Sequence, residues 1–100
     1  MQVSFTRTGG FTGIPLNITV DTRSLPFDRA NQLRHLVERA SFFDLPAALP
    51  APALPDRFQY EITAQKGDRQ HTVTVSEATI PATLKPLIDW LMEEVRGRGR

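Results

Sequence analysis

The stretch QVSFTRTGGFTGIPLNITVD, residues 2–21, decides how this chain begins to fold. Apolar and polar residues alternate before its glycines and again after them, a period of two that is typical of half-buried strands. The pattern predicts strands over residues 2–7 and 16–21. Because neighbouring strands usually pair, we expect these two to form an antiparallel hairpin.

The connection inside this hairpin is GGFTGI, residues 9–14. Connections run through water and favour polar residues, yet this one carries two large apolar side chains, Phe11 and Ile14. Apolar side chains on a glycine-rich loop suit burial by a partner, since glycine lets another backbone approach closely. The alternative, which the sequence leaves open, is that both side chains fold back and cap the core.

Helical spacing follows the hairpin. Leucine, valine and alanine recur at three- and four-residue intervals and predict a helix over residues 28–40. Asp28 suits its N-cap or its first turn, where an acid favours the helix dipole. A short helical turn is expected to begin at Ser41 and to end before Pro46.

Proline and then alternation mark the next part of the chain. Four prolines within residues 46–55 exclude a regular helix or an interior strand, and they predict an extended connection across the surface. Apolar residues alternate on both sides of a turn at Gly67. This pattern predicts a second hairpin, over residues 58–64 and 71–76.

The last predicted element is a helix with an apolar stripe over residues 84–95 and Thr83 as its N-cap. Pro86 then falls in the first turn, where backbone N–H groups have no partner inside the helix.

The order of the predicted elements is therefore β-β-α-(short helical turn)-β-β-α. With one apolar face on each element, it predicts an α+β fold: a four-stranded antiparallel sheet with two main helices on one face. Residues 1–100 form a single domain, and 96–100 are expected to be a frayed tail.

Composition narrows the class of protein. The chain has 40% hydrophobic and 23% charged residues, which is ordinary for a globular domain, and its net charge of +1 argues against a dedicated nucleic-acid binder. It has no cysteine, so disulfides and cysteine-based zinc sites are excluded. No signal peptide and no membrane-spanning stretch is evident. We expect a cytoplasmic protein without cofactor or membrane partner, and leave export without a cleavable signal open.

The sequence lacks the usual equipment for catalysis. His35 is expected to be exposed on the first helix and His71 to be a partly buried structural residue, and the two form no metal-binding pair. No two carboxylates are spaced as an acid and a base, and there is no G-x-S-x-G motif. The chain is therefore predicted to be no enzyme, with no catalytic or metal-binding residue. The terminal RGRGR is expected to be a solvated tail.

The unusual residues lie in connections, and these are the predicted partner-binding residues. Besides the first hairpin loop, the approach to the first helix carries Leu25 and Phe27, for which a hydrophobic staple before Asp28 is the structural alternative. Preorganised apolar loops suit a pocketed partner because little entropy is lost on binding. The predicted partner-binding residues are Gly9, Gly10, Phe11, Thr12, Gly13, Ile14, Leu25 and Phe27.

Most of the chain resembles the emfourin family, whose members inhibit thermolysin-like (protealysin-like) metalloproteases. The resemblance is carried by three motifs: GGFTG, FFDLP and P-x-x-L-K-P-L-I-D-W. The resemblance implies a protein that occludes the active-site cleft of a thermolysin-like zinc metalloprotease. A large apolar side chain of the predicted partner-binding residues would fill the pocket beside the zinc. A carboxylate approaching the zinc, from Asp21 or Asp28, is a further option, and which loop enters the cleft stays open.

A second function remains open. The same apolar loops could make the chain a non-enzymatic interaction module for a partner that is not a protease. In either case we expect a monomer when free.

Overall fold

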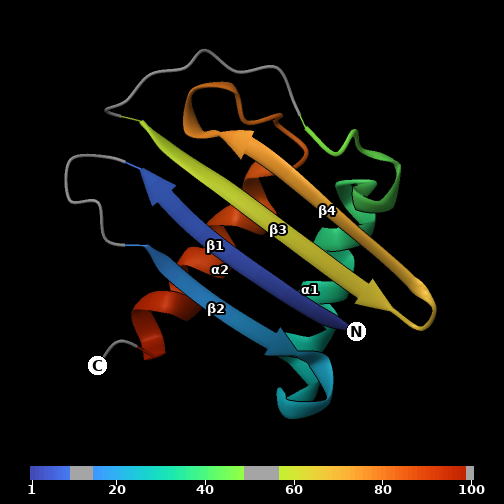
Figure 1. Cartoon of the computed structure of the whole chain (residues 1–100). Coiled ribbons are helices and arrows are strands. Elements are labelled where there is room, and N and C mark those ends of the chain that lie inside the picture. The colour runs from blue at the N-terminus through green and yellow to red at the C-terminus, as the bar shows by residue number, and fades with distance from the viewer. Residues whose placement is uncertain (10–14, 49–56, 99–100) are drawn as a thin grey trace.

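The computed structural model describes residues 1–9, 15–48 and 57–98. In these residues, β1 (Gln2–Gly9), β2 (Leu16–Asp21), β3 (Phe58–Lys66) and β4 (Arg69–Ser76) form one antiparallel sheet in the order β2-β1-β3-β4 (Figure 1). Both predicted hairpins are present, and β1 joins them by pairing with β3 along its whole length. The predicted four-stranded antiparallel sheet is confirmed.

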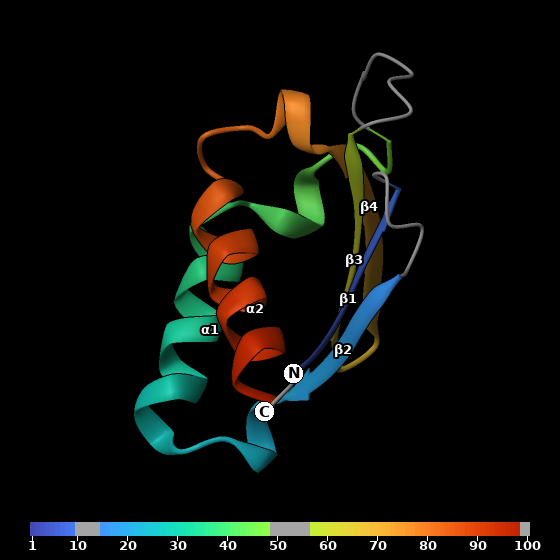
Figure 2. The ribbon, with the colours of Figure 1, turned by 90° about the vertical axis from the view of Figure 1, so that its left-hand side faces the viewer.

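Both main helices, α1 (Phe27–Arg39) and α2 (Lys85–Arg98), cover the same face of the sheet (Figure 2). Three short 3-10 helices join the larger elements: η1 (Thr22–Ser24), η2 (Phe42–Asp44) and η3 (Glu77–Thr79). The order matches the prediction, with η2 at the short helical turn expected after α1. Two layers therefore enclose one core, as an α+β arrangement requires.

The core lies between the sheet and the helices. The alternating residues of the strands and the apolar stripes of both helices are almost completely buried there, which confirms the predicted periodicity. The largest side chains that are fully buried are Phe5, Phe42, Leu33, Ile62, Leu84, Leu87 and Leu91. Burial of this apolar surface is the dominant favourable contribution to folding.

The helix ends differ in detail from the prediction. Pro26 occupies the N-cap position of α1, so Asp28 is an acid in the first turn and not the cap. Pro86 lies in the first turn of α2, as predicted, but the helix begins at Lys85, so Thr83 is one residue too early to be the predicted N-cap. The helix continues to Arg98 although the sequence predicts a frayed tail from residue 96. The partly buried Val95 still packs against the core and holds this last turn.

The segment after η2 lies along the outer edge of β4. The backbone N–H of Thr74 donates to the carbonyl oxygen of Ala47 at 2.9 Å, and Ala48 forms a parallel bridge with Thr74. The ring nitrogen Nε2 of His71 lies 2.6 Å from the carbonyl oxygen of Leu45. His71 is half-buried and holds this segment, which confirms its predicted structural role.

Candidate partner-binding surface

The predicted partner-binding residues that the structure describes are Gly9, Leu25 and Phe27, and they lie at two opposite ends of the sheet (Figure 1). Gly9 ends β1 at one end, and residues 10–14 lie outside the described residues. Leu25 and Phe27 follow β2 and lie at the other end. Because β2 has six residues, the two ends are separated by about 20 Å. The structure therefore does not bring Gly9 close to Leu25 and Phe27.

Gly9 has a conformation and surroundings that only glycine tolerates. Its φ is +91°, and a Cβ atom placed on it would lie 2.6 Å from the carbonyl oxygen of Arg57. Gly9 also pairs with Phe58 in the β1–β3 register. The end of β1 is thus packed backbone against backbone at Gly9, which the sequence predicts as the first residue of the loop and which the structure places in β1.

A cation and three aromatic rings reinforce this end of the sheet on the helix-facing side. The guanidinium carbon of Arg7 lies 4.1 Å from the ring centroid of Phe58, and its Nε is buried without a hydrogen-bond partner. Tyr60 lies opposite Arg7 and stacks on Phe5, with 5.6 Å between ring centroids. Burial raises the pKa of the Tyr60 phenol, nearby Glu77 adds to the rise, and Arg7 opposes it.

Glu77 joins this cluster from the other hairpin. Its carboxylate Oε1 accepts a hydrogen bond of 3.0 Å from the backbone N–H of Phe58, the first residue of β3. Charged acceptors make stronger hydrogen bonds than neutral ones. We call Arg7, Gly9, Phe58 and Glu77 the loop frame, because these residues fix the strand ends next to the predicted loop.

Phe27 is open to solvent. Its exposed fraction is 76%, and among the described residues it is the one large hydrophobic side chain that is exposed. It is the first residue of α1, so the hydrophobic staple considered for it is absent. Leu25 is different, because it is half-buried and packs against the core. Of this pair, Phe27 is available to a partner and Leu25 is largely structural.

The helix that carries Phe27 is fixed to its neighbour. Arg29 pairs with Glu94 of α2, and its guanidinium carbon lies 5.0 Å from the ring centroid of Trp90. The indole Nε1 of Trp90 donates to Oε1 of Gln32 at 3.2 Å. These contacts between α1 and α2 limit how far Phe27 can move with its backbone.

The two candidate carboxylates lie at the Phe27 end of the sheet. Asp21 accepts hydrogen bonds from the backbone N–H and the guanidinium of Arg23, with 2.9 Å between Nη2 and Oδ2. These bonds lower the pKa of Asp21 from 3.8 to about 2. Asp21 is thus already engaged as the cap of η1, whereas Asp28 is exposed.

Histidines offer no metal centre in the part of the chain that is described. His35 is exposed on α1, as predicted, and His71 is engaged with Leu45. No three His, Cys, Asp or Glu side chains among the described residues are grouped so as to hold a metal ion. Across residues 1–9, 15–48 and 57–98, every helix is too short or too polar to span a bilayer.

Of the loop frame, the sequence predicted Gly9 as a partner-binding residue but not Arg7, Phe58 or Glu77, although one signal was present. Arg7 occupies the same strand face as Val3 and Phe5, so a cation stands where an apolar residue is expected. Its partner Phe58 is distant in sequence and becomes a neighbour only through the β1–β3 register. The sequence thus shows that a cation, Arg7, stands on an apolar strand face. It does not show that Phe58 is its partner.

Comparison with known proteins gives one match. The family model described as Emfourin matches residues 5–92, which is most of the chain. No curated protein and no solved structure matches it.

Proposed function

The chain belongs to the emfourin family, and from this premise we propose that it inhibits a thermolysin-like zinc metalloprotease. Membership of this family implies the general role of a metalloprotease inhibitor, and an inhibitor needs no chemistry of its own. The family match is the observation that carries the proposal. The family match does not identify the target as thermolysin-like or say how the cleft is blocked, so both of these statements are our proposals.

We propose that residues 9–14 enter the active-site cleft. Support comes from the loop frame, since Gly9 and Phe58 hold the strand ends in one conformation next to this loop. A loop whose ends are fixed loses little entropy on binding and resists the distortion that cleavage requires. Phe11 or Ile14 would then fill an apolar pocket of the protease.

One cleft would not hold both predicted segments. Phe27 lies at the far end of β2, about 20 Å from the loop frame. We therefore assign Phe27 to a contact outside the cleft, and Leu25 to the support of η1 and α1. Asp21 is a poor zinc ligand because binding a metal would break its bonds to Arg23.

The test is hydrolysis of a fluorogenic peptide by a thermolysin-like protease after preincubation with the protein. We expect dose-dependent inhibition that excess substrate relieves, with an interface of about 800 Å² per partner. Binding to such a protease without loss of peptidase activity would contradict inhibition. No effect on several such proteases by the folded protein would instead favour the interaction module with a different partner.

A further inference from the structure

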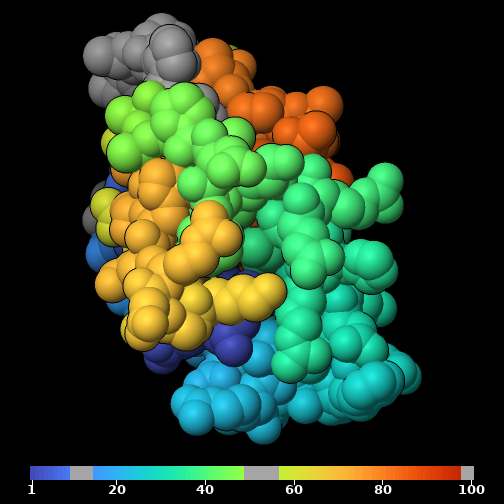
Figure 3. Space-filling view, turned by 90° about the vertical axis from the view of Figure 1, so that its right-hand side faces the viewer, coloured from blue at the N-terminus to red at the C-terminus, as the bar shows by residue number. Residues whose placement is uncertain are grey.

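A cavity of about 440 Å³ opens between α1, η2 and the β3–β4 turn, at the end of the sheet away from the loop frame. Figure 3 shows this face hollowed between the yellow-orange turn and the green helix. The cavity has an apolar wall that includes Val37, Phe42 and Phe43. Its volume falls in the range of sites for small ligands.

Two cations stand side by side at the mouth of this cavity. Lys66 ends β3 on the face of the buried Ile62 and Ala64, and Arg69 begins β4 on the face of His71 and Val73. Lys66 and Arg69 are direct partners in the β3–β4 register. Like charges in this arrangement repel and destabilise a sheet.

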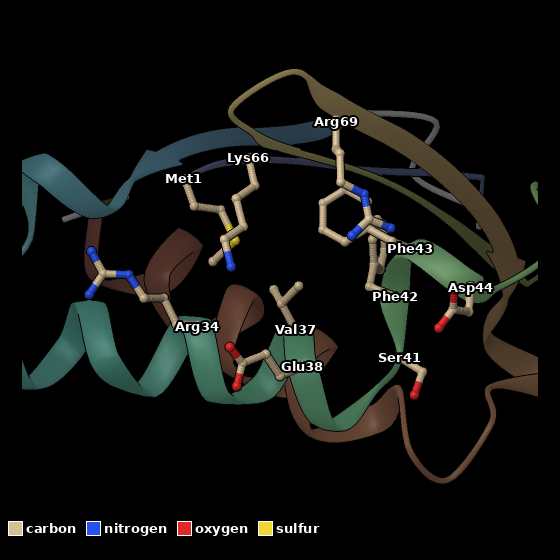
Figure 4. Close-up of a pocket in the computed structure, with 10 residues that line it drawn as sticks. All are labelled: Met1, Arg34, Val37, Glu38, Ser41, Phe42, Phe43, Asp44, Lys66 and Arg69. Carbon is tan, nitrogen blue, oxygen red and sulfur yellow. The ribbon is translucent and has the colours of Figure 1, made fainter.

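No carboxylate of the described residues forms a salt bridge with this pair, although Asp68 lies in the turn between the two cations. Neither Lys66 nor Arg69 forms a salt bridge there, and the guanidinium of Arg69 lies 4.6 Å from the ring centroid of Phe43. In Figure 4 the Lys66 side chain extends from the sheet toward α1, above Val37. The Lys66 ammonium group thus lies in the cavity between the sheet and α1, with the apolar Val37 and the acidic Glu38 on the helix side.

The charges around the cavity sum to a positive value. Arg34 adds a third cation from α1, and Glu38 and Asp44 add two anions, so these five side chains carry +1. Glu38 lies on α1, below Lys66 in the close-up, and Asp44 lies at the η2 side (Figure 4). An incoming carboxylate is therefore attracted by the Lys66–Arg69 pair. It is repelled by Glu38 on α1 and by Asp44 at η2.

We propose that this cavity binds a small organic acid with an apolar body. Lys66 would hold the carboxylate at the mouth, where it also relieves the repulsion between Lys66 and Arg69. The apolar body would lie against the half-buried ring of Phe43, where it displaces water from carbon surface, since Val37 and Phe42 are almost completely buried behind it. The proposal is independent of the loop that would enter the cleft, because the cavity lies at the other end of the sheet, where Phe27 also lies.

The test is a titration of the ¹⁵N-labelled full chain with 4-phenylbutyrate, followed by amide chemical shifts. We expect saturable shifts at Phe43, Lys66 and Arg69, with a dissociation constant of about 1 mM, as suits a ligand this small. The neutral alcohol 4-phenyl-1-butanol and acetate serve as controls. Each should bind at least about tenfold more weakly, since each lacks one half of the recognition.

The matched variants are Lys66→Gln and Lys85→Gln, which remove the same charge from two exposed lysines. Lys66→Gln should weaken binding by about tenfold, and Lys85→Gln, on α2 outside the cavity lining, should leave it unchanged. Equal binding of the acid and the alcohol to the unmodified protein would overturn the proposal. Equal losses in both variants, or shifts confined to other residues, would do the same.

Discussion

The two ends of the sheet differ in the interactions between their strands. At the loop frame, Gly9 packs against the backbone of Arg57, and Arg7 stacks on Phe58. At the other end, two cations face each other across the β3–β4 turn. Close packing fixes a backbone for a partner that must fit it, whereas unpaired charge favours a ligand that neutralises it. The first end therefore suits a protein partner, and the second suits a small anion.

The largest expected effect concerns the core that supports both ends. Leu87→Ala should lower the free energy of unfolding by about 2–5 kcal/mol, since Leu87 is fully buried between α2 and the sheet. Urea unfolding followed by circular dichroism measures this loss. Leu36→Ala is the matched control, because Leu36 is half-buried and should lose less. Equal losses would mean that Leu87 is no more important to the core than the half-buried Leu36, which would contradict its full burial.

The next effect compares the two ends of the sheet by replacing one glycine at each end, Gly9 or Gly67, with alanine. Gly9→Ala should cost about 2–4 kcal/mol of stability, through its positive φ and the clash with the Arg57 oxygen. Gly67→Ala, with φ +59° and open space around it, should cost only about 1–2 kcal/mol. Inhibition constants measured on folded protein should rise for Gly9→Ala alone. A similar rise for Gly67→Ala would remove the distinction between the ends.

A smaller effect compares the two cation–ring contacts. Arg7→Met should weaken inhibition several-fold while lowering stability by about 1–2 kcal/mol, since the contact between Arg7 and Phe58 is partly buried. Arg69→Met removes the equivalent contact with Phe43 at the other end and should leave inhibition unchanged. Peptide hydrolysis and urea unfolding measure the two quantities. If Arg69→Met weakens inhibition as much, the loop frame has no special role.

The comparison also shows what sequence can predict. Strand alternation and helical stripes predicted every main element, because burial imposes periods of two and 3.6 on the side chains. The need for Gly9 to be glycine was not predictable, since it arises from Arg57, which β1–β3 pairing brings close. The exposure of Phe27 was equally hidden, because a staple and a free side chain have the same sequence pattern before Asp28. Local patterns thus gave the elements, and the register between distant strands decided the site.

The smallest effect is electrostatic and lies next to Phe27. The hydrogen bonds from Arg23 lower the pKa of Asp21 to about 2, below its ordinary 3.8. Because the folded-state pKa is the lower one, this carboxylate stabilises the fold fully above the unfolded pKa and loses that contribution as pH falls through about 2. The urea midpoints of the unmodified protein and Asp21→Asn should therefore differ slightly at neutral pH and converge between about pH 4 and pH 2.

Asp28→Asn provides the control, since Asp28 is exposed and makes no such pair with arginine in the described residues. A difference for Asp21→Asn that stays constant down to pH 2 would show that the Arg23 pair does not form in solution. Asp21 would then be free to bind a metal, and its exclusion as a zinc ligand would no longer hold.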